Sequence, residues 1–240
     1  MLFYGRENIA AQDSSVIENH SYSKDNFTDG ALSFQLAIPS DLMQNAIKNK
    51  MGNKGFGASI LLASDPLSWG DNNKKSPVRI GIELGYNYFG MFVSKVSING
   101  YNGDYKTSYG IANLNSLIRL RPSVQRRFTP FVDAIAGGNF YLSRTTENLN
   151  LIETALGVEK TELGGTTNVS FNKGIGLGFS AGSTKTDRLR LTLRATYNRG
   201  KSVKYVVRNS LGYDAGTNRL TFDRNRAPVE YFLIQVGIGQ

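Results

Sequence analysis

Residues 168–182 read NVSFNKGIGLGFSAG, and residues 188–199 read RLRLTLRATYNR. In both segments apolar side chains alternate with polar or small ones, and a period of two residues is that of a β-strand. A short polar turn separates the segments, so together they predict a long antiparallel hairpin. Strands of soluble proteins usually run about five or six residues, whereas a tilted strand needs about ten to cross a bilayer. The hairpin therefore predicts a β-barrel that spans a membrane, with its polar face toward the lumen.

Six further segments alternate in the same way, at 31–38, 55–64, 78–88, 108–121, 128–143 and 229–239. The connections between the eight strands are alternately longer and shorter, and the longer ones cover 39–54, 90–107, 144–166 and 200–227. Bacterial barrels have an even number of strands, short periplasmic turns and longer extracellular loops. We therefore predict an all-β fold, an eight-stranded antiparallel up-and-down transmembrane β-barrel over residues 31–240. The same alternation of connections predicts a location in the bacterial outer membrane with both termini periplasmic.

Two segments fall outside this pattern. Residues 1–30 are polar and aperiodic, and we expect them to form a flexible periplasmic leader. Residues 41–51 predict a short helix, because Asp41 can cap it and Gln44 follows three residues later.

The aromatic residues of the apolar face are expected near the ends of the strands, with aliphatic residues between them. Those toward the outer ends are Tyr86, Tyr88, Phe140, Phe171, Tyr197 and Phe232, and those toward the inner ends are Phe128 and Phe179. Aromatic girdles at both interfaces are typical of membrane barrels.

The composition is compatible with such a barrel. No apolar run approaches the roughly 20 residues of a spanning helix. Barrel strands alternate apolar and polar residues, so averaged hydropathy does not reveal them. The formal net charge is +9, yet the lysines lie almost wholly in predicted loops, with Lys173 as the main exception. A basic groove interleaved with stacking aromatics, which single-stranded nucleic acid would require, is not visible. We therefore expect no nucleic-acid partner.

Two other all-β architectures compete with the membrane barrel. In a soluble lipocalin-like barrel the apolar face would line a ligand cavity and the polar face would meet water. A water-exposed face is normally rich in Lys and Glu, whereas this polar face consists of Gly, Ser, Thr, Asn and Arg. A β-sandwich is the other alternative.

The segments FTPFVDAIAGGNFYL at 128–142, GIGLGF at 174–179 and YFLIQVGIG at 231–239 resemble the eight-stranded outer membrane protein β-barrel families. The barrel of OmpA, OmpX and the PorT-like proteins of the Bacteroidota are examples. The likeness covers residues 31–239 and implies the same fold and membrane. Such barrels commonly end in an aromatic residue, whereas this chain ends in Gln240.

Charged residues on the polar face are the most specific feature of the predicted lumen. They are Arg79, Arg119, Arg121, Arg188, Arg190 and Arg194, together with Glu83 and Asp133. Buried like charges are costly unless they pair or stay hydrated, and side chains just fill an eight-stranded barrel. We expect a salt-bridged, hydrated plug, and the alternative is a narrow anion path, because rings of Arg favour anions.

Catalytic, cofactor and metal sites are not indicated. The chain has no cysteine, and its one histidine, His20, lies in the leader, so neither a zinc site nor a histidine-dependent lipid-modifying site is expected. The alternating glycines at 174–178 do not match a phosphate-binding loop, and small residues facing a crowded lumen explain them better.

The connection 200–227 is rich in bases and is predicted to contact lipopolysaccharide phosphates or an acidic partner. Its bases are Lys201, Lys204, Arg208, Arg219, Arg224 and Arg226.

Three functions stay open at this point. The first is a non-enzymatic structural or interaction barrel, as a subunit of or docking partner for a larger envelope complex. The second is a narrow channel or small-ligand transporter with an Arg-lined lumen, and the third is a soluble lipocalin-like binder.

Overall fold

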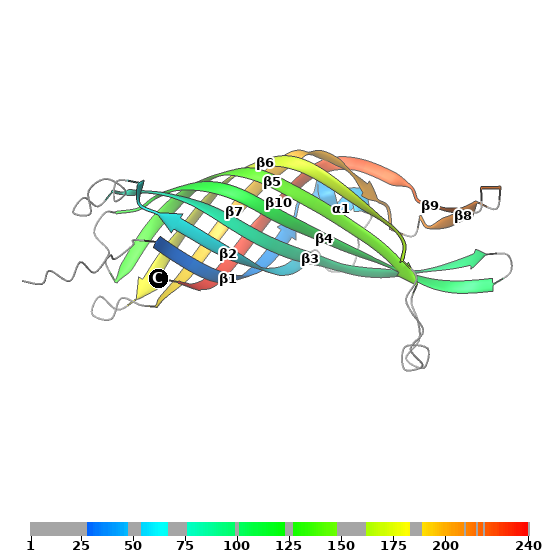
Figure 1. Cartoon of the computed structure of the whole chain (residues 1–240), viewed down its shortest axis with the longest axis horizontal. Helices are drawn as coiled ribbons and strands as arrows, with labels where there is room; N and C mark the ends of the chain where they lie inside the picture. The colour runs from blue at the N-terminus through cyan, green and yellow to red at the C-terminus, as the bar shows by residue number, and fades with distance from the viewer. Residues whose placement is uncertain are drawn as a thin grey trace, which may run out of the picture.

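The computed structural model describes residues 28–47, 54–66, 76–98, 101–122, 127–147, 162–182, 189–208, 210–214, 216–217 and 219–239. Within these ranges eight strands form a closed barrel, and every pair of neighbours is antiparallel (Figure 1). In order around the barrel, the strands are β1 (Thr28–Pro39), β10 (Arg224–Gly239), β7 (Arg190–Val206), β6 (Glu162–Gly182), β5 (Phe128–Glu147), β4 (Tyr101–Leu120), β3 (Val78–Ile98) and β2 (Gly55–Ser64). The eight-stranded fold expected from the alternation is confirmed.

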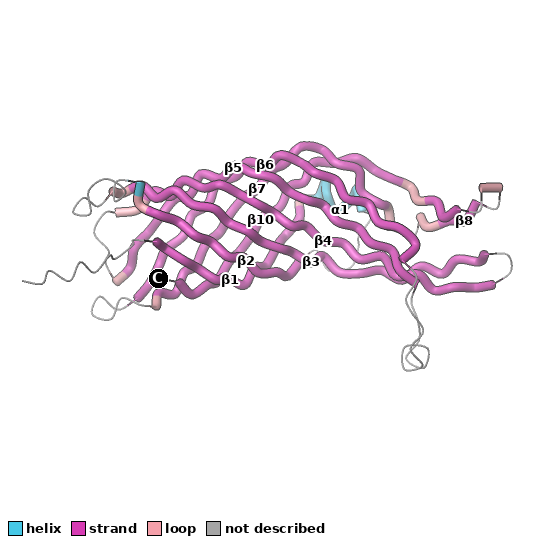
Figure 2. Tube along the Cα trace, viewed as in Figure 1, coloured by secondary structure: helices cyan, strands magenta, loops and turns pink. Residues whose placement is uncertain are grey.

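We call the end of the barrel where β1 starts and β10 finishes the near end, and the opposite end the far end. β1 begins at Thr28, three residues before the expected barrel boundary at residue 31. Residues 1–27 of the expected leader lie outside the described part of the chain. In Figure 2 the strands cross the barrel obliquely, and the single helix of the described part lies within its outline toward the far end.

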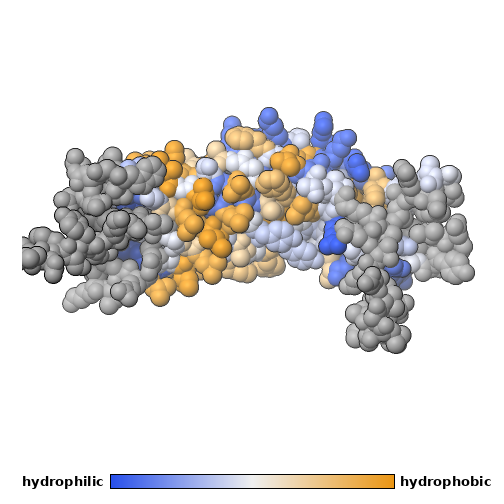
Figure 3. Space-filling view, in the orientation of Figure 1, coloured by the Kyte–Doolittle hydropathy of each residue, from blue (hydrophilic) through white to orange (hydrophobic). Residues whose placement is uncertain are grey.

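The alternation places the apolar side chains outside and the polar ones inside. Leu84 of β3 is 59% exposed, while its neighbour Glu83 is 2% exposed. Figure 3 shows apolar residues gathered in a broad band around the visible face, with hydrophilic residues toward the far end. We call this band the apolar belt. A lipocalin would have the opposite arrangement, so the soluble alternative is wrong.

At the far end, several strands extend well beyond their predicted ends. The loops expected at 90–107, 144–166 and 200–227 were therefore predicted too long. β3 and β4 pair out to Ile98 and Tyr101, and β5 reaches Glu147. In β3 the alternation changes phase at Gly90, which has a φ of 99° and accompanies a shift in register between Tyr88 and Met91. A bulge inserts one residue and reverses the faces that follow it. The sequence pattern therefore stops at the bulge although the strand continues.

The same phase change occurs in β7. The register with β10 shifts where two residues, Gly200 and Lys201, face the single residue Val229. Beyond this bulge the inward side chains include the buried Val203 and Tyr205, and they do not continue the phase of residues 194–198. Most of the expected loop at 200–227 is therefore strand. It also contains the small hairpin of β8 (Gly212–Asp214) and β9 (Arg219–Thr221).

The helix α1 (Asp41–Ile47) follows β1, and the residues after Ile47 up to 53 lie outside the described part. Ser40, and not Asp41, caps it: the Ser40 hydroxyl accepts a bond from the Met43 N–H at 3.4 Å, and the Gln44 side chain donates to the Pro39 carbonyl at 2.7 Å. Among the described residues no helix is long and apolar enough to cross a membrane.

A charge in the centre of the apolar belt should prevent stable insertion. Leu84→Arg is expected to cost about 2–4 kcal/mol of stability in a bilayer, because an Arg at the midplane has no water or headgroup within reach. Leu189→Arg is the matched control: Leu189 is also exposed, but it precedes the first residue of β7 at the near end. Its cost should be about 0–1 kcal/mol. Urea unfolding in liposomes measures both values, and equal costs would contradict the assigned belt.

Candidate functional site

The near half of the lumen holds a connected chain of charged side chains. Arg194 of β7 reaches Glu83 of β3, and its Nη1 donates to both carboxylate oxygens at 2.9 Å. The same guanidinium forms an ion pair with Asp133 of β5, with 2.7 Å between Nε and Oδ2. Asp133 also accepts two bonds from Arg119 of β4, at 2.7 and 2.9 Å. Residues from four strands are therefore joined across the lumen.

This chain is deeply buried and has further partners. Asp133 is 0% exposed and Arg194 is 4% exposed. Gln235 of β10 donates to Glu83 at 2.7 Å and to the Ser59 hydroxyl of β2 at 3.1 Å. Because each buried carboxylate accepts several well-placed bonds, the desolvation of the charges is largely offset. Arg119 also stacks on the Phe131 ring at 3.8 Å, a favourable cation–π contact.

A second ion pair, between Arg79 and Asp65, lies at the near end. The sequence analysis missed Asp65 because it ended the strand at residue 64. Extending the inward positions of β2 by one step, from Leu61 and Ala63, would have placed Asp65 in the lumen. Asp65 also accepts a bond from the Ser76 N–H at 2.9 Å.

The structure places the other predicted arginines as follows. Arg190 is buried and donates to the Thr129 hydroxyl at 3.0 Å and to the Ser180 carbonyl at 3.2 Å. Arg121 is only half-buried, because it lies just after the end of β4 at the near rim. Arg188 lies outside the described residues. In the described lumen, four buried arginines therefore face three buried acids, a smaller positive excess than the six arginines and two acids expected.

The glycines at 174–178 make room for these larger groups. A Cβ at Gly178 would lie 2.5 Å from Cζ of Phe131, and one at Gly174 would lie 2.6 Å from the Asn198 side-chain oxygen. At Gly176 it would lie 3.3 Å from both Arg194 Nε and Asp133 Cβ. The prediction of small residues facing a crowded lumen is confirmed.

Amide side chains fill the middle of the lumen. The buried asparagines are Asn87, Asn113, Asn115, Asn139, Asn172 and Asn198. The Asn139 side-chain oxygen accepts bonds from the Asn172 amide at 2.9 Å and from the Tyr231 hydroxyl at 3.0 Å. Sequence reasoning placed several of these asparagines on the inner face but assigned them no role.

The far half of the lumen is closed by α1. Met43, Ala46 and Ile47 are buried in an apolar cluster with inward residues of the barrel wall. The wall residues include Phe89, Tyr109, Ile111, Tyr141, Val203, Tyr205, Val229 and Tyr231. Tyr205 was not predicted to face inward, because it lies in an expected loop, and Tyr109, which has the inward parity of the predicted strand 108–121, was assigned no role. The helix therefore plugs the barrel, which the sequence analysis did not predict.

Both ends of the helix are fastened to the wall. At its start, the Ser40 N–H donates to the Glu230 carbonyl at 2.8 Å. At its end, the Arg208 N–H donates to the Ile47 carbonyl at 3.1 Å, and the Asn225 side chain donates to the Ala46 carbonyl at 3.3 Å.

Beyond the belt, Tyr205 packs edge-on against Tyr141 with 4.5 Å between ring centroids, and its burial raises the pKa of its hydroxyl. Tyr205 therefore stays neutral in this contact.

The basic residues that were predicted to contact an anionic partner do not all lie in the same environment. Lys201, Lys204, Arg224 and Arg226 are exposed, but they lie on or beside β7 and β10 and not in a flexible loop. The Arg208 guanidinium stacks on the Phe92 ring at 3.8 Å. The side chain of Arg219 lies outside the described part.

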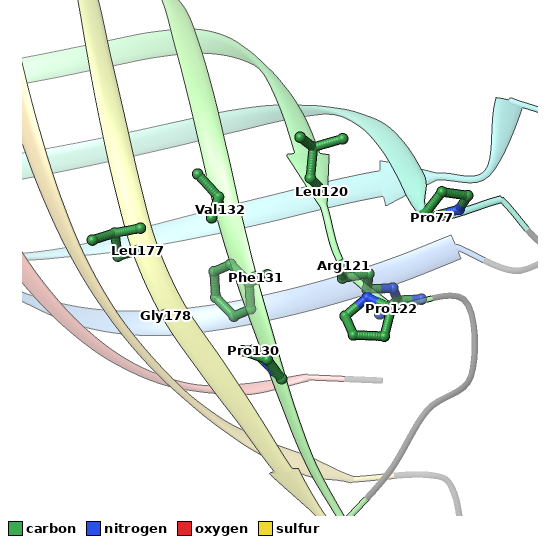
Figure 4. A pocket seen from close by; sticks show the side chains of 9 residues that line it. All are labelled: Pro77, Leu120, Arg121, Pro122, Pro130, Phe131, Val132, Leu177 and Gly178. Atoms are coloured by element: carbon green, nitrogen blue, oxygen red, sulfur yellow. The ribbon is translucent and has the colours of Figure 1, made fainter.

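An apolar groove of about 600 Å³ lies at the near rim, where β4 ends and β5 begins (Figure 4). It is lined by Pro77, Leu120, Arg121, Pro122, Pro130, Phe131, Val132, Leu177 and Gly178. Leu120, Val132 and Leu177 are exposed parts of the apolar belt. The groove is therefore a notch in the lipid-facing wall and brings no acid, base and nucleophile together.

The described residues contain no group of three or more His, Cys, Asp or Glu side chains placed to hold a metal ion. His20 lies outside the described part. Glu83 and Asp133 do not form an isolated acid and base, because arginines engage both carboxylates.

Comparison with known proteins gives structural likeness alone. No protein-family model matches the chain, and no curated protein sequence matches it. Ail of Yersinia pestis, solved with the heparin analogue sucrose octasulfate, has a TM-score of 0.47 at 8% identity over 88% of this chain and 95% of that one. A major outer membrane protein of Thermus thermophilus has a TM-score of 0.47 at 11% identity over 88% and 98%. Neisserial surface protein A has a TM-score of 0.43 at 12% identity over 88% and 94%. The fold that the described residues form is a closed, eight-stranded antiparallel barrel.

Removing the centre of the buried charge chain should destabilise the barrel strongly. Arg194→Met leaves Glu83 and Asp133 without their shared cation, and breaking a buried pair typically costs about 3–5 kcal/mol. Lys95→Met is the control, because Lys95 is exposed on the far extension of β3 and its loss should cost less than about 0.5 kcal/mol. The measurement is the midpoint of urea unfolding in detergent micelles. A similar midpoint for both variants would show that the charge chain contributes little.

Proposed function

We propose that this chain is a closed, non-enzymatic outer-membrane barrel that acts through its surfaces, as a subunit of or docking partner for a larger envelope complex. The observation that carries the proposal is the double closure of the lumen. The charge chain around Arg194 crosses the near half, and α1 with its apolar cluster fills the far half. The proposal therefore assigns interaction to the wall and to the far-end extensions.

The membrane location is supported by the apolar belt around a closed barrel. A closed barrel satisfies every backbone hydrogen bond between strands, and only such barrels and helices can span a bilayer. We infer that the near end, which carries both termini of the barrel, faces the periplasm. The far end, with longer strands beyond the belt, then faces outward, as extracellular loops do in bacterial barrels.

The far-end extensions offer ordered surface for a protein partner. The β3–β4 hairpin continues past the belt to Ile98 and Tyr101, and the β8–β9 hairpin lies at the same end (Figure 1). In the turn of the second hairpin, Asp214 accepts bonds from the Thr217 hydroxyl at 2.7 Å and the Gly216 N–H at 3.0 Å. These two bonds lower the pKa of Asp214, so the turn keeps its negative charge at neutral pH.

The channel hypothesis is the second candidate, and the arginine excess in the lumen favours it. The buried arginines give the lumen a positive character that would select anions if a path opened. Each of the two closures opposes a permanently open path. We propose no catalytic role and no cofactor, because the buried acids are neutralised by arginines.

Planar-bilayer recording tests the closure. The wild type should show little or no steady conductance. Replacing residues 41–47 by a Gly/Ser segment of equal length removes the far closure, and Glu83→Ala with Arg194→Ala opens the near one without changing the net charge. Each change alone should leave the barrel silent, whereas the combined variant should conduct. Stable openings of the wild type would favour the channel hypothesis, and heat-modifiable gel mobility verifies that each variant has folded.

A further inference from the structure

Six exposed cations cover the outer wall of β6, β7 and β10 at the far edge of the apolar belt. These residues, which we call the basic wall, are Lys173, Arg199, Lys201, Lys204, Arg224 and Arg226. Within the described part of the chain, none of their side chains forms an ion pair or hydrogen bond. Glu230 is an acidic residue on the same wall, and its carboxylate accepts a hydrogen bond from the Tyr197 hydroxyl. Glu230 also lies directly opposite Arg199 in the register between β10 and β7, so the basic wall holds six cations against this one acid and keeps a local positive charge.

The strand register brings cations of this wall directly opposite one another. Lys173 of β6 pairs with Arg199 of β7, and Lys204 of β7 pairs with Arg226 of β10. Like charges at directly opposite positions of a sheet are destabilising. An anion bound between the members of each pair would convert this repulsion into attraction.

The depth of the pairs relative to the belt shows which kind of anion can reach them. Lys173 lies between Phe171 and Ile175 on the outward face of β6, and both neighbours are 57% exposed. A lysine there is costly in hydrocarbon unless its long side chain extends to the headgroups. Arg199 follows Tyr197, whose ring packs on Phe232 with 4.9 Å between centroids. Aromatic residues of this type lie at the headgroup level. Val169 and Phe171 lie farther toward the far end on the same face of β6, so the backbone of Lys173 lies within the belt, and we infer that its ammonium extends to the headgroup level beside Arg199.

We propose that the basic wall is a binding site for the phosphate groups of a phosphorylated glycolipid in the outer leaflet. Lys173 and Arg199 hold one phosphate at the edge of the belt, and Lys204 and Arg226 hold a second anionic group farther from the membrane. Arg and Lys form strong, charge-assisted hydrogen bonds with phosphate oxygens. A lipid is the expected occupant because these side chains point away from the barrel at a depth where lipid is the neighbour. This inference rests on the proposed orientation, and it names the lipid partner of the outer surface.

The structure changes the site that the sequence indicated. Sequence reasoning selected bases of one expected loop and treated Lys173 as an isolated exception. Lys173 and Arg199 belong to two other predicted strand segments, and the register between β6 and β7 is what brings them together. Arg208, in contrast, leaves the set because it stacks on Phe92 inside the far-end extension.

The test measures retention of a defined lipid by the full chain folded in detergent. The probes are bisphosphorylated lipid A, the same lipid with both phosphates removed, and phosphatidylglycerol, each offered at equal concentration. After affinity purification, mass spectrometry counts the lipid retained per barrel. The variant is Lys173→Gln with Arg199→Gln. The control is Lys95→Gln with Arg144→Gln, which removes the same charge from exposed positions on β3 and β5.

We expect the wild type and the control to retain bisphosphorylated lipid A. The basic-wall variant should retain about tenfold less, because each Lys or Arg near an anionic lipid surface strengthens binding to it. Retention by the wild type should fall at 0.5 M NaCl, because exposed charges are screened. Equal retention of the dephosphorylated lipid by the wild type, or equal loss in the control variant, would overturn the proposal. So would retention of an acidic protein in place of lipid.

Failure of this proposal can be distinguished from failure of the proposed function. Heat-modifiable gel mobility and insertion into neutral phosphatidylcholine liposomes report the barrel itself, and both should be identical for wild type, variant and control. A chain that does not insert would refute the membrane barrel. A chain that inserts normally but ignores lipid phosphates would refute only the basic wall.

Discussion

The bridge from Arg194 to Glu83 and Asp133 constrains the interior of this barrel more than any other contact. A single guanidinium joins β7 to β3 and β5, and Arg119 and Gln235 extend the connection to β4 and β10. Charges buried this deeply are costly unless they are paired with opposite charges. That requirement explains why glycines stand opposite them: Gly176 and Gly178 leave the space that Arg194, Asp133 and Phe131 occupy.

The interior is divided into two chemically different halves, and each closes the lumen by a different interaction. The near half depends on paired charges and the far half on apolar packing of α1 against wall residues such as Tyr205 and Val229. Between them, Asn139 accepts hydrogen bonds from Asn172 and Tyr231. Tyr231 belongs both to this hydrogen-bonded group and to the apolar cluster of the far half, so the two halves share a residue.

On the outside, the same strands have two sections, one within the apolar belt and one in the far-end extensions. Within the belt, the outward residues must be apolar, and the alternation is regular. At Gly90 in β3 and at Gly200 in β7 the phase changes, and the strands continue toward the far end, with Met91, Val93 and Lys95 outward on β3 and Ser202 and Lys204 outward on β7. The bulges therefore separate a membrane-spanning section from a section that can interact with headgroups and with proteins. The basic wall lies at this transition on β6, β7 and β10.

The period-two pattern by itself determined the strand number, the apolar exterior and the inward positions of Arg79, Glu83, Arg119, Asp133, Arg190 and Arg194, because the pleat assigns alternate residues to opposite faces. It could not determine which charges meet, since cross-lumen contacts such as Arg194 with Glu83 join residues 111 positions apart. It missed Asp65 because it ended that strand at residue 64, and it missed the extensions of β3 and β7 and the inward Tyr205 because a bulge reverses the phase without a sequence period to mark it. Only the tertiary structure placed α1 inside the barrel and Lys173 opposite Arg199, because packing and register are set by the closure of the whole sheet.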